Sequence, residues 1–119
     1  MGKELAKSLL IRGASVTIAA RRILQLEEAK RDLEPFTCKG AKLEIVSVDV
    51  TDADSCVRML EEAERRQSAA TDCVICCAGA AVPGFFHEQD PKTFASQIAL
   101  NYLGAVNSIH VRLIYERYC

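Results

Sequence analysis

The most restrictive feature of this 119-residue sequence is an alternation of helical patterns with short, almost entirely apolar runs. The three runs are Ala14–Ala20, Leu43–Val48 and Asp72–Cys77. Strands without a regular polar face are typical of parallel sheets that are covered on both sides. Alternation of such strands with helices predicts the α/β fold class, in which ligands bind at the carboxyl ends of the strands.

Four helices are predicted from apolar residues that recur every three or four positions. They cover residues 5–10, residues 23–34, the segment after a cap at Thr51 or Asp52, and the segment from Pro91 to the C-terminus. Gly13 and Pro35 stand where the first two helices are expected to end. The pair Asp90-Pro91 is typical of a helix start, because aspartate caps the first turn and proline fits it.

Composition excludes several other classes of protein. The 15 basic and 16 acidic side chains leave a net charge of −1, which gives no electrostatic basis for binding nucleic acid or an anionic membrane. Half of the residues are hydrophobic, as in a globular chain of one domain. The longest stretch without charged side chains, Thr93–Val111, carries too many polar groups for a membrane span.

The six cysteines are expected to be reduced, because the sequence opens on a helical pattern without a secretory leader. Cys73 and Cys76 match a metal or redox spacing, but in a strand they would face opposite sides. His87 and His110 lack the spacing of zinc ligands. No metal site is therefore predicted, and His87 is interpreted as a solvated loop residue.

Polar residues follow the first two predicted strands. Arg21 and Arg22 come after the first strand, where guanidinium groups suit a 2′-phosphate; the alternative is a solvated helix start. Asp49 and Val50 come after the second strand. A carboxylate there can accept a hydrogen bond from an adenine amino group while valine packs on the ring, or Asp49 simply caps the next helix.

Small residues follow the third predicted strand. Cys77, Ala78 and Gly79 would let a ligand approach the backbone closely, or would form a tight turn that needs glycine. Asn101 is a poor residue for a helix interior, so it either holds backbone or water near a site or lies on an exposed face. Gly104 either permits close packing against another element or is merely tolerated.

Five groups of residues in this order resemble the short-chain dehydrogenase/reductase family over essentially the whole chain. They are Gly2-Lys3, Ala20-Arg21, Asp49-Val50, Cys77-Ala78-Gly79 and Asn101-Tyr102-Leu103-Gly104. Within the family the sequence is most similar to the 3-ketodihydrosphingosine reductase branch. The resemblance implies an incomplete Rossmann-like, doubly wound parallel sheet of three strands and four helices. Residues 1–119 would be a partial NADP-binding domain that lacks the family's first strand and C-terminal half.

The resemblance also implies an activity and the residues that serve it. The activity is NADPH-dependent reduction of 3-ketosphinganine to sphinganine in sphingolipid synthesis, on the cytosolic face of the endoplasmic reticulum, by an enzyme that can be oligomeric. Gly2 would end the phosphate-binding turn, and Asn101 would belong to the catalytic tetrad. The implied contacts to NADPH are Arg21 and Arg22 at the 2′-phosphate, Asp49 and Val50 at the adenine, and Cys77, Ala78 and Gly79 beside a ribose.

One departure from the family bears on activity. No tyrosine in the sequence is followed four residues later by lysine, so the family's proton donor and the lysine that tunes it are missing from these 119 residues. The chain alone is therefore expected neither to bind NADPH tightly nor to reduce ketones. The alternatives are a non-catalytic module for nucleotide sensing or protein contact, and a small flavodoxin-like or response-regulator-like domain, which the helical N-terminus disfavours.

A second departure bears on stability. The family's first strand lies between the strands expected at Ala14–Ala20 and Asp72–Cys77. Without it, unpaired backbone groups would each cost about 1–3 kcal/mol, against a total domain stability of roughly 5–15 kcal/mol. The chain alone is thus expected to be marginal, rearranged or prone to aggregation, unless the two strands pair directly.

Overall fold

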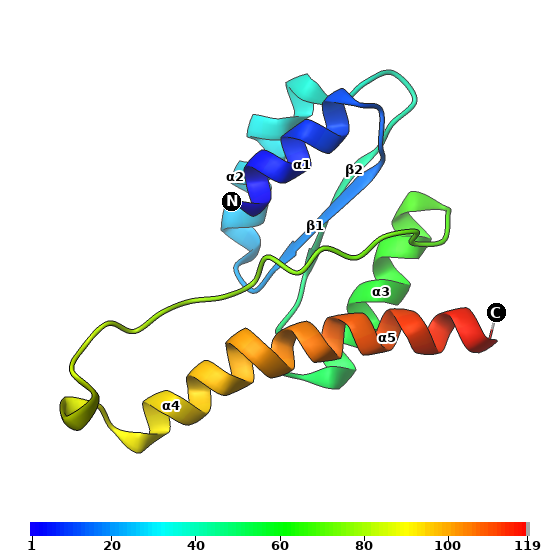
Figure 1. Cartoon of the computed structure of the whole chain (residues 1–119). Coiled ribbons are helices and arrows are strands. Elements are labelled where there is room, and N and C mark those ends of the chain that lie inside the picture. Colours follow the sequence, from blue (N-terminus) through cyan, green and yellow to red (C-terminus); the bar gives the residue numbers. More distant parts are fainter. Residues whose placement is uncertain (119) are drawn as a thin grey trace.

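A computed structural model describes the backbone of residues 1–118 and the side chains of residues 1–114. The main elements, in chain order, are α1 (Gly2–Ile11), β1 (Val16–Ala20), α2 (Ile23–Leu33), β2 (Leu43–Ser47), α3 (Ala53–Gln67), α4 (Pro91–Ile98) and α5 (Gly104–Tyr118) (Figure 1). A π-helical turn, η3 (Ala99–Leu103), joins α4 to α5 without a break. We call these three elements together the α4–α5 rod, and with it the chain has the four expected helices.

The sheet of the described residues consists of β1 and β2, which pair in parallel from Val16 opposite Leu43 to Ala20 opposite Ser47. Val16 and Ile18 pack on a buried cluster that α1 and α2 share with β2. Thr17 points the other way and accepts a hydrogen bond from Gln67 at the end of α3, at 3.0 Å. Helices therefore cover both faces of the sheet, and the predicted α/β class is confirmed.

A second buried cluster lies beyond the carboxyl end of β2, where α3 packs against the rod. It contains Val48, Cys56, Leu60 and Val111. Cys56 and Leu60 are four residues apart, so they share one face of α3, and both are buried. This cluster fixes the rod next to the end of the sheet, and Figure 1 shows α5 crossing below the strands.

The prediction of a third strand at Asp72–Cys77 is wrong. Residues 70–83 form an extended segment that has no strand partner within the described part of the chain. Its side chains are largely exposed, including Ile75 at 47%. A strand depends on backbone hydrogen bonds to a neighbour, and direct pairing with β1 does not occur. The segment is attached instead to the rod, where the Cys76 thiol lies 3.9 Å from the Ala105 carbonyl oxygen and Arg112 donates to the Thr71 carbonyl.

The helix ends follow the sequence signals. Gly13 has a φ of +85°, a left-handed conformation that glycine adopts readily after α1. Of the two candidate caps for α3 it is Asp52 that accepts a hydrogen bond from the Asp54 amide, at 3.1 Å. Asp90 caps α4 in the same way, accepting from the Lys92 amide at 2.8 Å.

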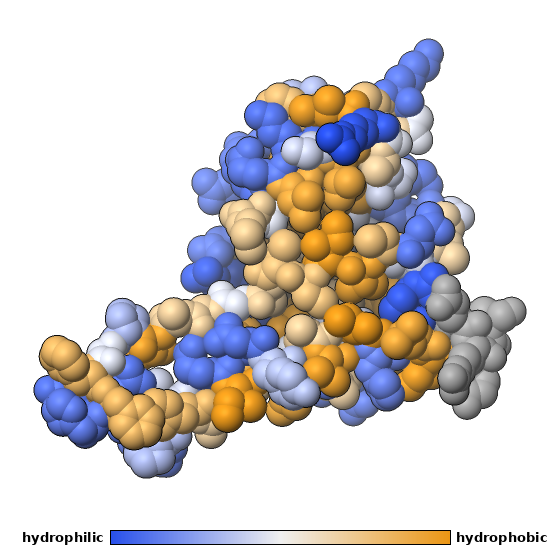
Figure 2. Space-filling view, viewed as in Figure 1, coloured by the Kyte–Doolittle hydropathy of each residue, from blue (hydrophilic) through white to orange (hydrophobic). Residues whose placement is uncertain are grey.

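Much apolar surface stays open to solvent. Figure 2 shows apolar residues reaching the surface across the middle of the viewed face. Along the rod, Tyr102 is 65% and Leu113 55% exposed. None of the described helices is both long and apolar enough to cross a bilayer.

Candidate functional site

The parallel register brings the carboxyl ends of β1 and β2 together at one edge of the sheet. Arg21 follows β1 directly, and its carbonyl oxygen accepts a hydrogen bond of 3.2 Å from the Ser47 hydroxyl at the end of β2. Asp49 lies two residues beyond β2. Because Ala20 pairs with Ser47, both residues lie at this edge of the sheet, and the charge of Arg21 makes a small contribution to lowering the pKa of Asp49.

The carboxylate of Asp49 is held in its ionised form mainly by Thr51. The Thr51 hydroxyl and amide both donate to Oδ1, at 2.7 and 3.0 Å, and these bonds are the largest causes that lower the pKa of Asp49. Oδ2 is left without a partner among the described residues. Of the residues expected to cap the next helix together, Asp49, Thr51 and Asp52, it is Asp52 that is the N-cap of α3, while Asp49 accepts from Thr51 just before the helix.

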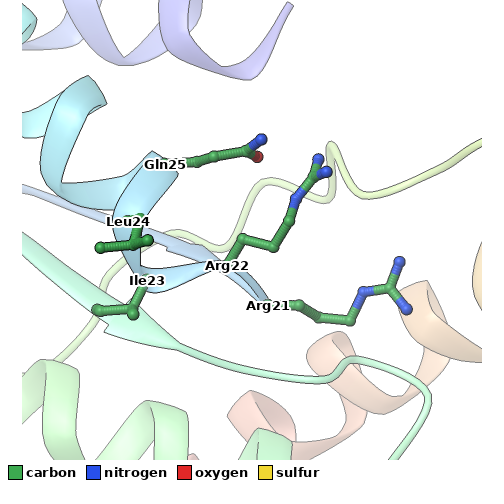
Figure 3. A pocket seen from close by; sticks show the side chains of 5 residues that line it. All are labelled: Arg21, Arg22, Ile23, Leu24 and Gln25. Carbon is green, nitrogen blue, oxygen red and sulfur yellow. The ribbon is translucent and has the colours of Figure 1, made fainter.

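Arg21 and Arg22 line a shallow pocket of about 470 Å³ at the start of α2. In Figure 3 the side chains of Arg21, Arg22 and Gln25 extend to one side, while Ile23 and Leu24 point to the other. Both arginines are exposed, and within the described residues neither guanidinium has an ion pair or hydrogen bond. The pocket therefore offers two free cations to an anionic group.

Asn101 fastens the extended segment to the rod. Its Oδ1 accepts from the Ala80 amide at 3.0 Å, and its Nδ2 donates to the Ala80 carbonyl at 2.9 Å. Asn101 therefore holds backbone, as one interpretation expected, and it also lies on an exposed face, as the other expected. A Cβ on Gly79 would lie 3.0 Å from the Asn101 Oδ1, and Gly79 has no positive φ. Gly79 therefore serves close approach and not a tight turn.

The first turn of α1 lies beside the same segment. A Cβ built on Gly2 would be 3.3 Å from the Cys77 Cβ. No side chain caps the start of α1, so the amide groups of its first turn remain available to an acceptor. Cys77 and Ala78 are exposed next to it. Gly2 and the Cys77–Gly79 segment are thereby brought together.

Two further residues connect the rod with the end of β2. A Cβ on Gly104 would lie only 2.7 Å from the Val50 Cγ2, which confirms the close-packing interpretation of this glycine. Asn107 donates from Nδ2 to the Val50 carbonyl oxygen at 2.9 Å. The sequence analysis did not single out Asn107. The available signal was a polar side chain three residues after Gly104, on the face that buries Ser108 and Val111.

The side chains at this edge of the sheet have the chemistry to bind an anion and to accept a hydrogen bond. Two guanidinium groups, an ionised carboxylate with a free oxygen and an open glycine segment suit a phosphorylated nucleotide. The five described cysteines are free thiols, and burial raises the pKa of Cys56 and Cys76, which disfavours thiolate formation. Among the described residues, no three potential metal ligands lie close enough together to hold an ion. His87 is exposed, as expected of a loop residue.

Comparison with known proteins gives the family. A sequence model described as short chain dehydrogenase matches residues 1–115. The chain is 39% identical over 114 residues to a PIGF/3-ketodihydrosphingosine reductase fusion protein of Schizosaccharomyces pombe, covering 95% of this chain and 22% of that protein. It is 38% identical over 116 residues to a 3-ketodihydrosphingosine reductase of Aspergillus fumigatus, covering 95% of this chain and 32% of that protein. The chain thus spans about a fifth to a third of the length of these relatives.

Solved structures agree on the fold. A short-chain type dehydrogenase/reductase from Mycobacterium ulcerans superposes with a TM-score of 0.84 at 25% identity, over 93% of this chain and 40% of that one. An actinorhodin polyketide ketoreductase, solved with NADPH, gives a TM-score of 0.84 at 20% identity, over 94% and 41%. These likenesses confirm the Rossmann-like, partial α/β fold. With the match over residues 1–115, they show that the chain belongs to the short-chain dehydrogenase/reductase family.

Proposed function

We propose that residues 1–119 are part of one NADP-binding domain and that they hold the adenosine 2′-phosphate side of NADPH. The observation that carries this proposal is the position of Arg21 directly after β1 and of Asp49 two residues after β2, at the paired carboxyl ends of the two strands. A cation and a hydrogen-bond acceptor at that edge match the two ends of a 2′-phosphorylated adenosine.

The residues present fit NADPH along the whole rim. Arg21 and Arg22 would hold the 2′-phosphate, and the free Oδ2 of Asp49 would accept a hydrogen bond from the adenine amino group. The other residues would contact the cofactor as follows: Val50 the adenine ring, Gly2 the pyrophosphate, and Cys77, Ala78 and Gly79 the second ribose. NADPH supplies a hydride to a ketone when it is bound, and Asn101 keeps the segment next to that ribose in place through Ala80.

The substrate follows from the relatives. Two proteins that share 38–39% identity with this chain carry the name 3-ketodihydrosphingosine reductase. We infer that the chain serves the reduction of that ketone in sphingolipid synthesis, at the cytosolic face of the endoplasmic reticulum. Asn101 is the one member of the family's catalytic tetrad that these 119 residues match, because Tyr102 is followed four positions later by Val106.

Nucleotide recognition is tested with fragments of the cofactor. Binding of 2′,5′-ADP and 5′-AMP to the 119-residue chain is followed by NMR titration. We expect a preference of about tenfold for 2′,5′-ADP, because a hydrogen bond to a charged group contributes about 1.5 kcal/mol. Arg21→Ala removes this preference, whereas Arg12→Ala, at the opposite end of β1, retains it. Equal affinity of the unaltered chain for the two nucleotides would refute the proposal.

Catalysis is tested separately. The purified chain is mixed with NADPH and 3-ketodihydrosphingosine, and NADPH oxidation is followed by absorbance. Because no tyrosine–lysine pair is present to donate a proton, we expect no turnover above the rate without protein. Turnover would contradict the expected inactivity. The alternative function is a non-catalytic nucleotide sensor, which micromolar NADPH affinity without turnover would support.

A further inference from the structure

We propose that Asn107 is a positioning residue that holds the Asp49–Val50 segment in the place needed to recognise adenine. The proposal rests on the proposed NADPH function and assigns one element of its base specificity to α5. Asn107 touches neither the pocket of Arg21 nor the Gly79 segment, so its role would be exerted through Val50 alone.

The contact joins parts of the chain that are 57 residues apart. Asn107 is half-buried, and its Nδ2 donates to the Val50 carbonyl oxygen at 2.9 Å. The same oxygen has only a weaker second contact, with the Cys56 thiol at 3.8 Å. The neighbouring Ser108 hydroxyl donates back to the Gly104 carbonyl at 2.8 Å. Of the two side chains that contact the Val50 carbonyl oxygen, Asn107 therefore makes the shorter and stronger hydrogen bond.

The Asp49–Val50 segment has few other hydrogen bonds to distant parts of the chain, while the Val50 side chain packs against the buried cluster between α3 and α5. The ladder of the sheet ends before it, with the Val48 amide donating to the Ala20 carbonyl at 3.0 Å. The hydrogen bonds of Asp49 to Thr51 and Ser55 are local. Among the described residues, the bond from Asn107 is thus the long-range hydrogen bond that places this segment.

The rod spaces two parts of the candidate site. Asn101 binds Ala80, and Asn107 binds Val50 six residues later, about 9 Å along a helix that rises 1.5 Å per residue. Gly104, between them, lets Val50 approach the helix to contact distance. Loss of the Asn107 bond would free the adenine side of the site while leaving Asn101 and the two arginines in place.

The test compares two preferences of the full 119-residue chain. The base preference is the ratio of affinities for NADPH and for its hypoxanthine analogue, deamino-NADPH, which lacks the adenine amino group. The phosphate preference is the ratio for 2′,5′-ADP and 5′-AMP. We expect a base preference of about tenfold in the unaltered chain, since the amino group donates to an ionised carboxylate.

Asn107→Leu keeps the size of the side chain and removes the donor. We expect its base preference to fall to nearly one while the phosphate preference is retained, which a general loss of structure would not produce. Asn107→Gln keeps a donor and should restore much of the preference. His110→Leu is the matched control, because it makes the same type of change at an exposed position of α5. If Asn107→Leu does not fold, Asn107→Ser, whose hydroxyl is too short to reach, is measured instead.

The outcomes separate the two proposals. A base preference that persists in Asn107→Leu and Asn107→Ser would overturn the role of Asn107. An equal fall in both preferences would also overturn it, because that result indicates general destabilisation. If the unaltered chain has no phosphate preference, the proposed NADPH function fails first, and the role of Asn107 fails with it.

Discussion

Replacement of Gly104 by alanine adds one methyl group where α5 and the Val50 segment come closest. The new Cβ would lie 2.7 Å from the Val50 Cγ2 and 3.3 Å from the Val50 Cβ. Real Cβ atoms do not approach a carbon to 2.7 Å, so one of the two elements must move. Gly104 itself has helical backbone angles, φ −59° and ψ −40°, which alanine adopts without strain.

Two opposing effects decide the change in the free energy of unfolding. Alanine in place of glycine favours a helix by about 1 kcal/mol. Overpacking of a filled contact costs about 1–3 kcal/mol, and Val50 gives way poorly because its branched side chain has one preferred rotamer. The rod is also fastened on either side of Gly104 by Asn101 and Asn107, which resists a shift. We therefore expect Gly104→Ala to destabilise the chain by about 1 kcal/mol.

A double-mutant cycle separates the two effects. Val50→Ala removes Cγ2 and with it the 2.7 Å overlap, so in that background the methyl group at position 104 meets only the Cβ of residue 50, at 3.3 Å, and the Ala99 carbonyl oxygen, at 3.7 Å. There Gly104→Ala should stabilise the chain by up to about 1 kcal/mol, the helical preference alone. Urea unfolding followed by circular dichroism measures all four chains. If Gly104→Ala is stabilising by the same amount in both backgrounds, the close contact with Val50 does not exist and the reasoning is refuted.

Four further predictions concern the caps, the charges and the open segment. Asp52→Ala should lower the free energy of unfolding, measured with urea, by about 1 kcal/mol because α3 loses its cap. If Asp49→Ala lowers it by this amount and Asp52→Ala does not, Asp52 is not the cap. Two arginines hold the pKa of Glu62 at about 2, below its usual 4.5, so its contribution is complete above pH 4.5 and is lost as the pH falls towards 2. Unfolding of Glu62→Gln should lack that part of the acid dependence. Asn101→Ala should accelerate amide hydrogen exchange at Ala80, and an unchanged rate would exclude the two-point contact. The amide hydrogens of residues 72–77 should exchange rapidly with solvent, and strong protection of these amides would indicate that the segment pairs as a strand. The chain should also self-associate at high concentration in sedimentation experiments.

The helices were predictable because each satisfies its hydrogen bonds from nearby residues. Apolar residues at helical spacing are buried at Ala6 and Leu10 of α1 and at Cys56, Leu60 and Ala63 of α3, whereas Leu5 is exposed. Gly13 and Asp90 marked ends that the structure retains. Two of the three apolar runs became strands because they lie next to each other in the fold. The residue types at their ends also indicated where an anion and a base would bind.

The third apolar run shows where such reasoning stops. A strand takes its backbone hydrogen bonds from a neighbour that can lie anywhere in the chain, so the apolar composition of Asp72–Cys77 could not show that it would remain unpaired. The same limit hid Asn107, because its partner, the Val50 carbonyl, is a backbone atom with no signature in the sequence.

The sequence by itself determined the local elements of this protein, their caps and the residues offered at the strand ends, since these depend on short-range sterics and hydrogen bonds. Only the tertiary structure decided which strands pair and how closely α5 approaches Val50. It also decided that one rod binds both the Asp49–Val50 segment and the Gly79–Ala80 segment. Those features are set by contacts between residues far apart in the chain, which packing alone brings within a few ångströms.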